Sequence, residues 1–126
     1  MISFSEFEIE DGSPLYLQII LFIKRGLVAG AIHDRDEMPS RRVLSALLGV
    51  NPNTVQKAYR ILEEEGLVES RTGAASFITI GEGQTRQIKA QLLEADLQGL
   101  VTAMRQMGVS KAEAAALLEK AWEEPT

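Results

Sequence analysis

Polar and basic side chains recur between residues 51 and 62 at the spacing of one helix face. The apolar residues of this segment follow the i, i+3, i+4, i+7 pattern of a buried face: Val55, Ala58, Tyr59 and Leu62. The polar residues then lie on the other side: Asn53, Thr54, Gln56, Lys57 and Arg60. Amide, hydroxyl and cationic groups on a helix can bind base edges and phosphates in the major groove of DNA. These residue types therefore favour nucleic-acid binding.

The charge pattern supports the same interpretation. The chain has a formal net charge of −5, yet residues 38–62 contain no Asp or Glu. The cations of this stretch are Arg41, Arg42, Lys57 and Arg60. Attraction to phosphate acts over about 8 to 10 Å, so a local excess of cations is sufficient for binding. A solvated helix surface that merely lacks acids is the alternative. The three glutamates at 63–65 are expected to form a solvated flank that DNA avoids.

Two short helices joined by a tight turn must position these side chains. Ser40 is a capping residue for the first helix, and Gly49 is suited to end it. Asn51 can cap the second helix, in which Pro52 fits the first turn and Gly66 marks the end. The sequence therefore predicts a helix-turn-helix.

The flanking segments predict a supporting helix and a β-hairpin. Residues 1–13 are irregular, and Pro14 opens a helix that runs to Gly30. Its apolar stripe comprises Leu15, Ile19, Phe22, Ile23 and Leu27. After the helix pair, LVESR and SFITI alternate like two strands around a turn that contains Gly73. A hairpin here is a wing, in which Arg71 and Gly73 are predicted to reach a phosphate or the minor groove. The alternative is that the hairpin only covers the core.

The C-terminal third predicts a helical hairpin that pairs with a partner. Residues 81–85, GEGQT, are predicted to be a linker. The next helix carries apolar residues at intervals of 4, 3, 4 and 3: Leu93, Leu97, Leu100, Met104 and Met107. Ser110 and Glu113 form a capping box for a last helix that carries Leu118 and Trp122. Two helices alone cannot bury this surface. A second copy would cover it as a twofold dimer; the alternative is that the hairpin folds back on its own winged domain.

Composition excludes several other classes of function. The chain has no cysteine and one histidine, His33, which is predicted to lie on the surface, so thiol chemistry and a typical zinc site are not expected. No phosphate-binding glycine loop or nucleophile beside a base occurs, so neither an enzyme nor a cofactor is expected. No apolar run is long enough to span a membrane and the first residues do not resemble a signal peptide, so a cytoplasmic location is expected.

The segments PLYLQIILFIKRGLVAGAI and MPSRRVLSALLGVNPNTVQKAYRILEEEGLVESRTG resemble the winged helix-turn-helix domain of GntR family transcription regulators. The resemblance covers residues 14–80, and the short two-helix tail is similar to the YtrA subfamily. It implies a homodimer that usually acts as a repressor, often of a transporter operon. A protein interaction module without specific DNA binding is the alternative function.

The resemblance also assigns DNA contacts by position. They fall on Arg42 with its neighbour Arg41, on the first turns of the second helix of the pair, and on the wing at Gly73. The helix positions are Asn51, Asn53, Thr54, Gln56 and Lys57. Related wings often read RGKG where this chain has TGAA, so a weaker wing contact is expected.

These inferences predict a mainly α (α+β) protein with a winged helix-turn-helix at residues 1–80, a linker at 81–85 and a dimerisation hairpin at 86–126. The residues predicted to dimerise are Leu93, Leu97, Leu100, Met104, Leu118 and Trp122. The predicted partners are a palindromic double-stranded DNA operator and a second copy of the chain. The sequence does not indicate a small-molecule effector.

Overall fold

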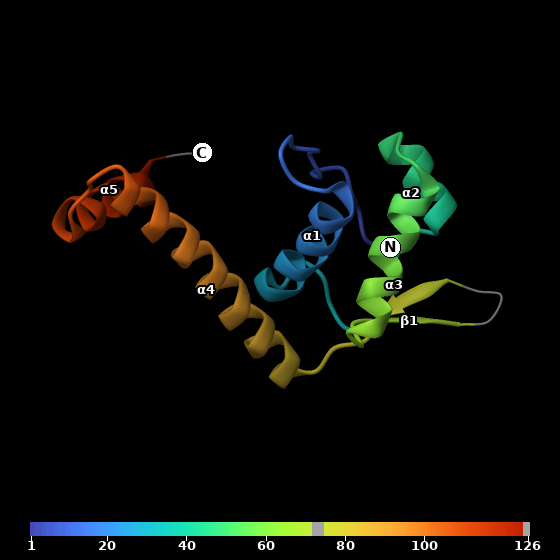
Figure 1. Cartoon of the computed structure of the whole chain (residues 1–126). Helices are drawn as coiled ribbons and strands as arrows, with labels where there is room; N and C mark the ends of the chain where they lie inside the picture. The colour runs from blue at the N-terminus through green and yellow to red at the C-terminus, as the bar shows by residue number, and fades with distance from the viewer. Residues whose placement is uncertain (72–74, 125–126) are drawn as a thin grey trace. The chain divides into compact units, whose positions relative to one another are not determined.

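The computed structural model describes residues 1–71 and 75–124, which form two compact units divided after residue 89. Figure 1 shows the order of the elements, which confirms the predicted mainly helical fold with one small sheet. The elements are α1 (Leu15–Ala29), α2 (Arg41–Leu48), α3 (Pro52–Glu64), β1 (Val68–Ser70), β2 (Ser76–Ile78), α4 (Glu82–Gln106) and α5 (Lys111–Glu123).

Helix α1 is the support of the N-terminal unit. It begins directly after Pro14 and ends at Gly30, whose φ of 81° is left-handed and favours glycine. Its buried side chains are Ile19, Ile20, Ile23 and Leu27. Three residues of the predicted stripe are thus buried, while its other two members, Leu15 and Phe22, are half-buried. The buried residues fix which side of α1 faces the rest of the unit.

The irregular N-terminal segment is held against α1 by aromatic packing. The ring of Phe22 on α1 lies 4.8 Å from that of Phe4 and 5.4 Å from that of Phe7. Phe4 is buried, while Ile9 is half exposed. Apolar contacts with α1 therefore order residues that have no regular secondary structure.

Helix α3 lies at the centre of the N-terminal unit and packs against both α1 and α2 (Figure 1). Its four predicted core residues are completely buried: Val55, Ala58, Tyr59 and Leu62. The Tyr59 hydroxyl donates a 2.6 Å hydrogen bond to the carbonyl oxygen of Pro39. Burial raises the pKa of the Tyr59 phenol, so this group stays a neutral donor. One side chain thus joins α3 to the segment that precedes α2.

Strands β1 and β2 form the predicted antiparallel hairpin, in which Val68 pairs with Ile78. The segment before α2 adds to the other edge of β2, because the Met38 amide donates to the Ser76 carbonyl at 2.9 Å and the Arg35 amide to the Ile78 carbonyl at 2.8 Å. This polar segment between α1 and α2 thus anchors the hairpin, so β2 has backbone partners on both sides.

The linker prediction for residues 81–85 needs correction, because α4 already begins at Glu82. The Gly81 amide donates to the Gln84 side chain at 3.0 Å, and the Thr85 amide donates to the Gly81 carbonyl at 3.1 Å. These bonds satisfy groups at the helix start, and Glu82 suits the positive end of the helix dipole. The boundary between the compact units falls inside α4, after residue 89.

The second unit contains the rest of α4, a turn at Gly108 and α5. Gly108 has a left-handed φ of 73°, and the Ser110 hydroxyl accepts a 3.2 Å hydrogen bond from the Glu113 amide, one of the two bonds of the predicted capping box. Several large apolar side chains of this unit are exposed: Leu93, Leu97, Leu100, Val101, Met107, Leu117, Leu118 and Trp122. Met104 is half-buried.

Candidate nucleic-acid interface

The predicted polar face of α3 lies on the surface. Its exposed side chains are Asn53, Gln56, Lys57 and Arg60, and Thr54 is half-buried. Because the opposite face of α3 is fully buried against α1 and α2, the backbone that carries these side chains is held firmly. A rigid helix with amide, hydroxyl and ammonium groups on its first two turns has the form of an element that enters the major groove.

The turn between α2 and α3 forms as local chemistry predicts. The Ser40 hydroxyl accepts a hydrogen bond from the Val43 amide at 3.1 Å, and Gly49 adopts a left-handed φ of 68°. The side-chain oxygen of Asn51 accepts a hydrogen bond from the Asn53 amide at 2.8 Å. Because that oxygen already caps α3, the side-chain group of Asn51 that remains available to DNA is its NH₂ group.

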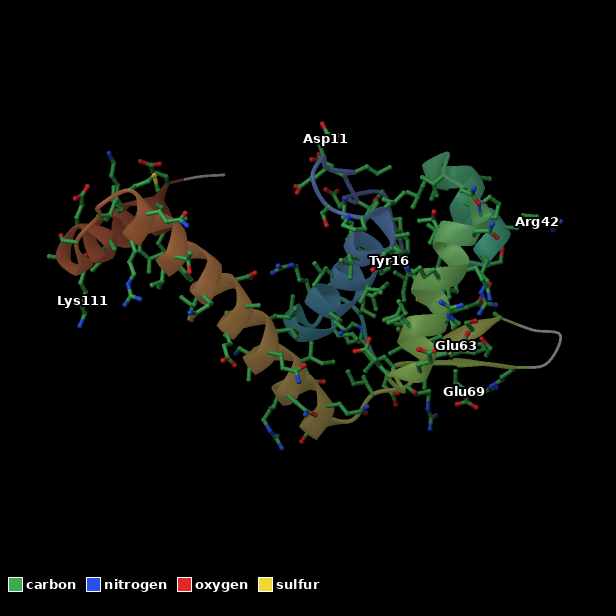
Figure 2. The ribbon with its side chains drawn as sticks, viewed as in Figure 1. Asp11, Tyr16, Arg42, Glu63, Glu69 and Lys111 are labelled. Carbon is green, nitrogen blue, oxygen red and sulfur yellow. The ribbon has the colours of Figure 1, made fainter. Side chains whose placement is uncertain are left out.

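The four cations near the helix pair fall into two classes. Arg41 lies 2.6 Å from a Glu63 carboxylate oxygen, and Arg60 lies 3.8 Å from Glu64. Within residues 1–71 and 75–124, neither Arg42 nor Lys57 has a carboxylate partner. Arg42 extends from the outer side of α2 (Figure 2), so it and Lys57 are the more accessible positive charges for a phosphate.

The acidic run at the end of α3 is exposed at Glu64 and Glu65, as predicted for a solvated flank, whereas Glu63 is half-buried. Each of its three carboxylates lies beside a cation, with Glu65 paired to Lys24 of α1 at 2.9 Å. Residues 38–62 contain no acidic residue, but in the folded chain Glu63 and Glu64 lie beside two of the four cations of this stretch, Arg41 and Arg60. The positively charged surface is therefore smaller than the number of cations in residues 38–62 suggests.

Tyr16 is a residue of this surface that the sequence pattern does not indicate. It lies on the first turn of α1, and the Lys57 ammonium is 4.0 Å from the centre of its ring, within the range of a cation–π contact. Figure 2 shows Tyr16 on the side of α1 that faces α3. No local residue pattern indicates this contact, because Lys57 lies 41 positions further along the sequence.

The hairpin places one further cation on the surface. The Arg71 guanidinium lies 4.9 Å from the centre of the Phe77 ring, and its side chain is exposed just beyond β1. Gly73, the other predicted wing contact, lies outside the described residues. His33 is exposed, as predicted, and its amide donates to Asp36 at 2.8 Å.

We also searched the part of the chain that the structure describes for a metal site and for a membrane-spanning helix. No group of three or more His, Asp or Glu residues there is placed to hold a metal ion. No helix within those residues is both long and apolar enough to cross a lipid bilayer.

Together, the helix pair, the helix α1 behind it and the hairpin beside it define the winged helix-turn-helix class of DNA-binding folds. A family model described as "Bacterial regulatory proteins, gntR family" matches residues 15–78, half of the chain. The chain belongs to this family.

Comparison with individual proteins extends the similarity into the tail. The HTH-type transcriptional regulator YhcF of Bacillus subtilis is 34% identical over 106 residues, which span 84% of this chain and 88% of YhcF. The HTH-type transcriptional repressor YtrA of the same organism is 39% identical over 88 residues, 65% of this chain and 68% of YtrA. A GntR family transcriptional regulator from Listeria monocytogenes superposes with a TM-score of 0.78 at 28% identity, covering 89% of this chain and 98% of that chain. These similarities support the YtrA subfamily.

Proposed function

We propose that this chain is a sequence-specific transcription regulator that binds a palindromic DNA operator as a homodimer and acts as a repressor. The observation that carries the proposal is the exposed polar face of α3, which rests on a fully buried core face. The name of the relative YtrA, a transcriptional repressor, supports repression. The YtrA-type resemblance extends the proposal to a transporter operon, and binding to an operator would place the protein in the cytoplasm.

Different residues of the surface have different proposed roles. The side-chain amides of Asn53 and Gln56 suit the paired donor and acceptor of an adenine edge, with Thr54 beside them. Lys57 and Arg42 bind phosphates, and Arg71 with Gly73 contacts the backbone or the minor groove. Asn51 contributes its NH₂ group beside the α3 cap.

The tail supplies the dimer in this proposal. Leu97 is 55% exposed, Leu93 50% and Trp122 83% in the single chain. Pairing of two tails would cover Leu93, Leu97, Leu100, Met104, Leu118 and Trp122. A twofold dimer presents two copies of α3 to half-sites about one DNA turn, roughly 34 Å, apart or a multiple of it.

Selection of bound duplexes from a random DNA pool tests the proposal. Enrichment of an inverted repeat is expected, since a twofold protein selects a twofold site. Failure to enrich any sequence at moderate salt would overturn the proposal. It would leave the winged domain as a protein interaction module that uses the same basic surface.

Substitution of Lys57 by alanine is expected to weaken binding about equally on operator and unrelated DNA. A lysine that neutralises one phosphate releases about one counterion per subunit, so the slope of log K against log salt falls by about one per subunit. Filter binding at several salt concentrations measures this slope. Lys89→Ala removes the same charge from the exposed surface of α4 and serves as the control. Equal slopes for the two variants would remove Lys57 from the interface.

A further inference from the structure

One carboxylate oxygen joins the helix pair to the hairpin. The Oε1 atom of Glu63, near the end of α3, accepts a hydrogen bond from Arg41 Nη2 at 2.6 Å and another from the Ser70 hydroxyl at 2.6 Å. The Ser70 hydroxyl also lies 2.9 Å from that of Ser76 on β2. Figure 2 shows Glu63 on α3 beside the hairpin. Glu63 thus links α2, α3, β1 and β2.

The bonded groups stand next to the cations that are proposed to touch DNA. Arg41 immediately precedes Arg42 on α2, and Ser70 immediately precedes Arg71 at the end of β1. A single oxygen on α3 therefore bonds the sequence neighbours of both Arg42 and Arg71. Movement of either partner away from Glu63 would displace the neighbouring cation relative to the exposed face of α3.

The bonds have the features of a structural contact. The side chains of Arg41 and Glu63 are 35% and 31% exposed, and both bonds to the carboxylate are short, as expected when one group is charged. The Arg41 guanidinium also lies 5.2 Å from the centre of the buried Tyr59 ring. Arg41 is therefore held on two sides, and its charge is largely compensated by Glu63.

We propose that Glu63 is a positioning residue for DNA recognition, which fixes the start of α2 and the wing relative to α3 and keeps the charge of Arg41 away from DNA. This inference rests on the proposed function. Arg41 then acts through this ion pair, while Arg42 binds phosphate. Specific binding needs all three elements in register, whereas non-specific binding needs only positive charge. Glu63 therefore raises the preference for the operator over other DNA.

Glu63→Gln tests the inference, with Glu64→Gln as the matched control. Both variants remove one negative charge from the same turn of α3, but Glu64 is 67% exposed and lies 3.8 Å from Arg60 on the same helix. Titrations with the selected operator and with a scrambled duplex at one salt concentration give each variant's preference. Glu63→Gln is expected to lower the preference about tenfold, the effect of losing one charged hydrogen bond. Glu64→Gln is expected to shift both affinities together and keep the ratio.

Hydrogen exchange of the free protein supplies a readout that does not depend on DNA. Amides in residues 68–70 and 76–78 should exchange faster in Glu63→Gln than in wild type or Glu64→Gln. Ser70→Ala breaks only the bond to the hairpin, and should lower the preference in the same direction even if Glu63→Gln folds poorly. Wild-type preference in both Glu63→Gln and Ser70→Ala would overturn the inference. If the wild-type protein bound the operator and the scrambled duplex equally well, the proposed function would be overturned instead. If, in addition, the hairpin amides of Glu63→Gln exchanged at the wild-type rate, the positioning role of Glu63 would be overturned as well.

Discussion

Replacement of Tyr59 by alanine is expected to lower the free energy of unfolding of the N-terminal unit by about 3 to 5 kcal/mol, the usual cost of removing a buried aromatic ring. Tyr59 is completely buried, and it is among the largest fully buried side chains in the described residues. Its ring fills the space between α3 and the start of α2, beneath Arg41. Such a loss is a large part of the stability of a small domain, so operator binding should fall with it.

Tyr59→Phe separates the hydroxyl from the ring. It keeps the packing but leaves the Pro39 carbonyl without its 2.6 Å bond, at a cost of about 1 to 3 kcal/mol. Urea denaturation followed by circular dichroism gives both free energies on the same scale. The loss should be clearly larger for alanine than for phenylalanine. Equal losses for the two variants would contradict a packing role for the ring.

The helix-turn-helix was predictable because local chemistry determines it. Ser40 and Asn51 bind amides two or three residues away, and Gly49 supplies a left-handed φ that L side chains rarely adopt. The buried stripe of α3 follows from the period of the helix alone. Each of these signals acts within one or two turns, so the residue spacing contains all the information that is needed.

The electrostatics of the surface were not predictable, because they depend on contacts between distant residues. Glu63 lies 22 positions from Arg41, and Lys57 lies 41 from Tyr16. A charge count along the sequence cannot show that a carboxylate just beyond the basic stretch folds back onto one of its cations. The sequence alone therefore predicts the same role for Arg41 and Arg42, although their surroundings differ.

Backbone partners outside the regular elements were also missed. The segment before α2 has the composition of a polar loop, but its backbone amides donate hydrogen bonds to β2. No residue pattern in the sequence predicts this pairing or its register. At residues 81–85, two glycines indicated a linker, because glycine costs about 1 kcal/mol in a helix. The side chain of Gln84 and the amide of Thr85, both bonded to Gly81, support the helix start there. Glycine content alone was therefore a misleading signal.

Replacement of Leu97 by glutamate is expected to disrupt the proposed dimer. It places a charge in the middle of the apolar seam of α4, which is formed by Leu93, Leu97, Leu100 and Met104. If two tails pair, this charge would be buried against the partner, and the dimer should dissociate at concentrations where wild type is paired. Gln98→Glu is the matched control, since it adds the same charge at the next position, which lies off the seam. Sedimentation equilibrium measures the mass of each variant.

Loss of the dimer should weaken operator binding about 100-fold or more, because the second α3 would no longer bind at the high effective concentration that a linked partner provides. Affinity for a single half-site should stay unchanged, since Leu97 lies in the second compact unit and not among the residues of the polar face of α3. These two results together distinguish lost pairing from a damaged DNA-binding surface. A Leu97→Glu protein with the mass of wild type and full operator affinity would show that this seam does not form the dimer. In that case another surface would have to bring two copies of α3 to the operator.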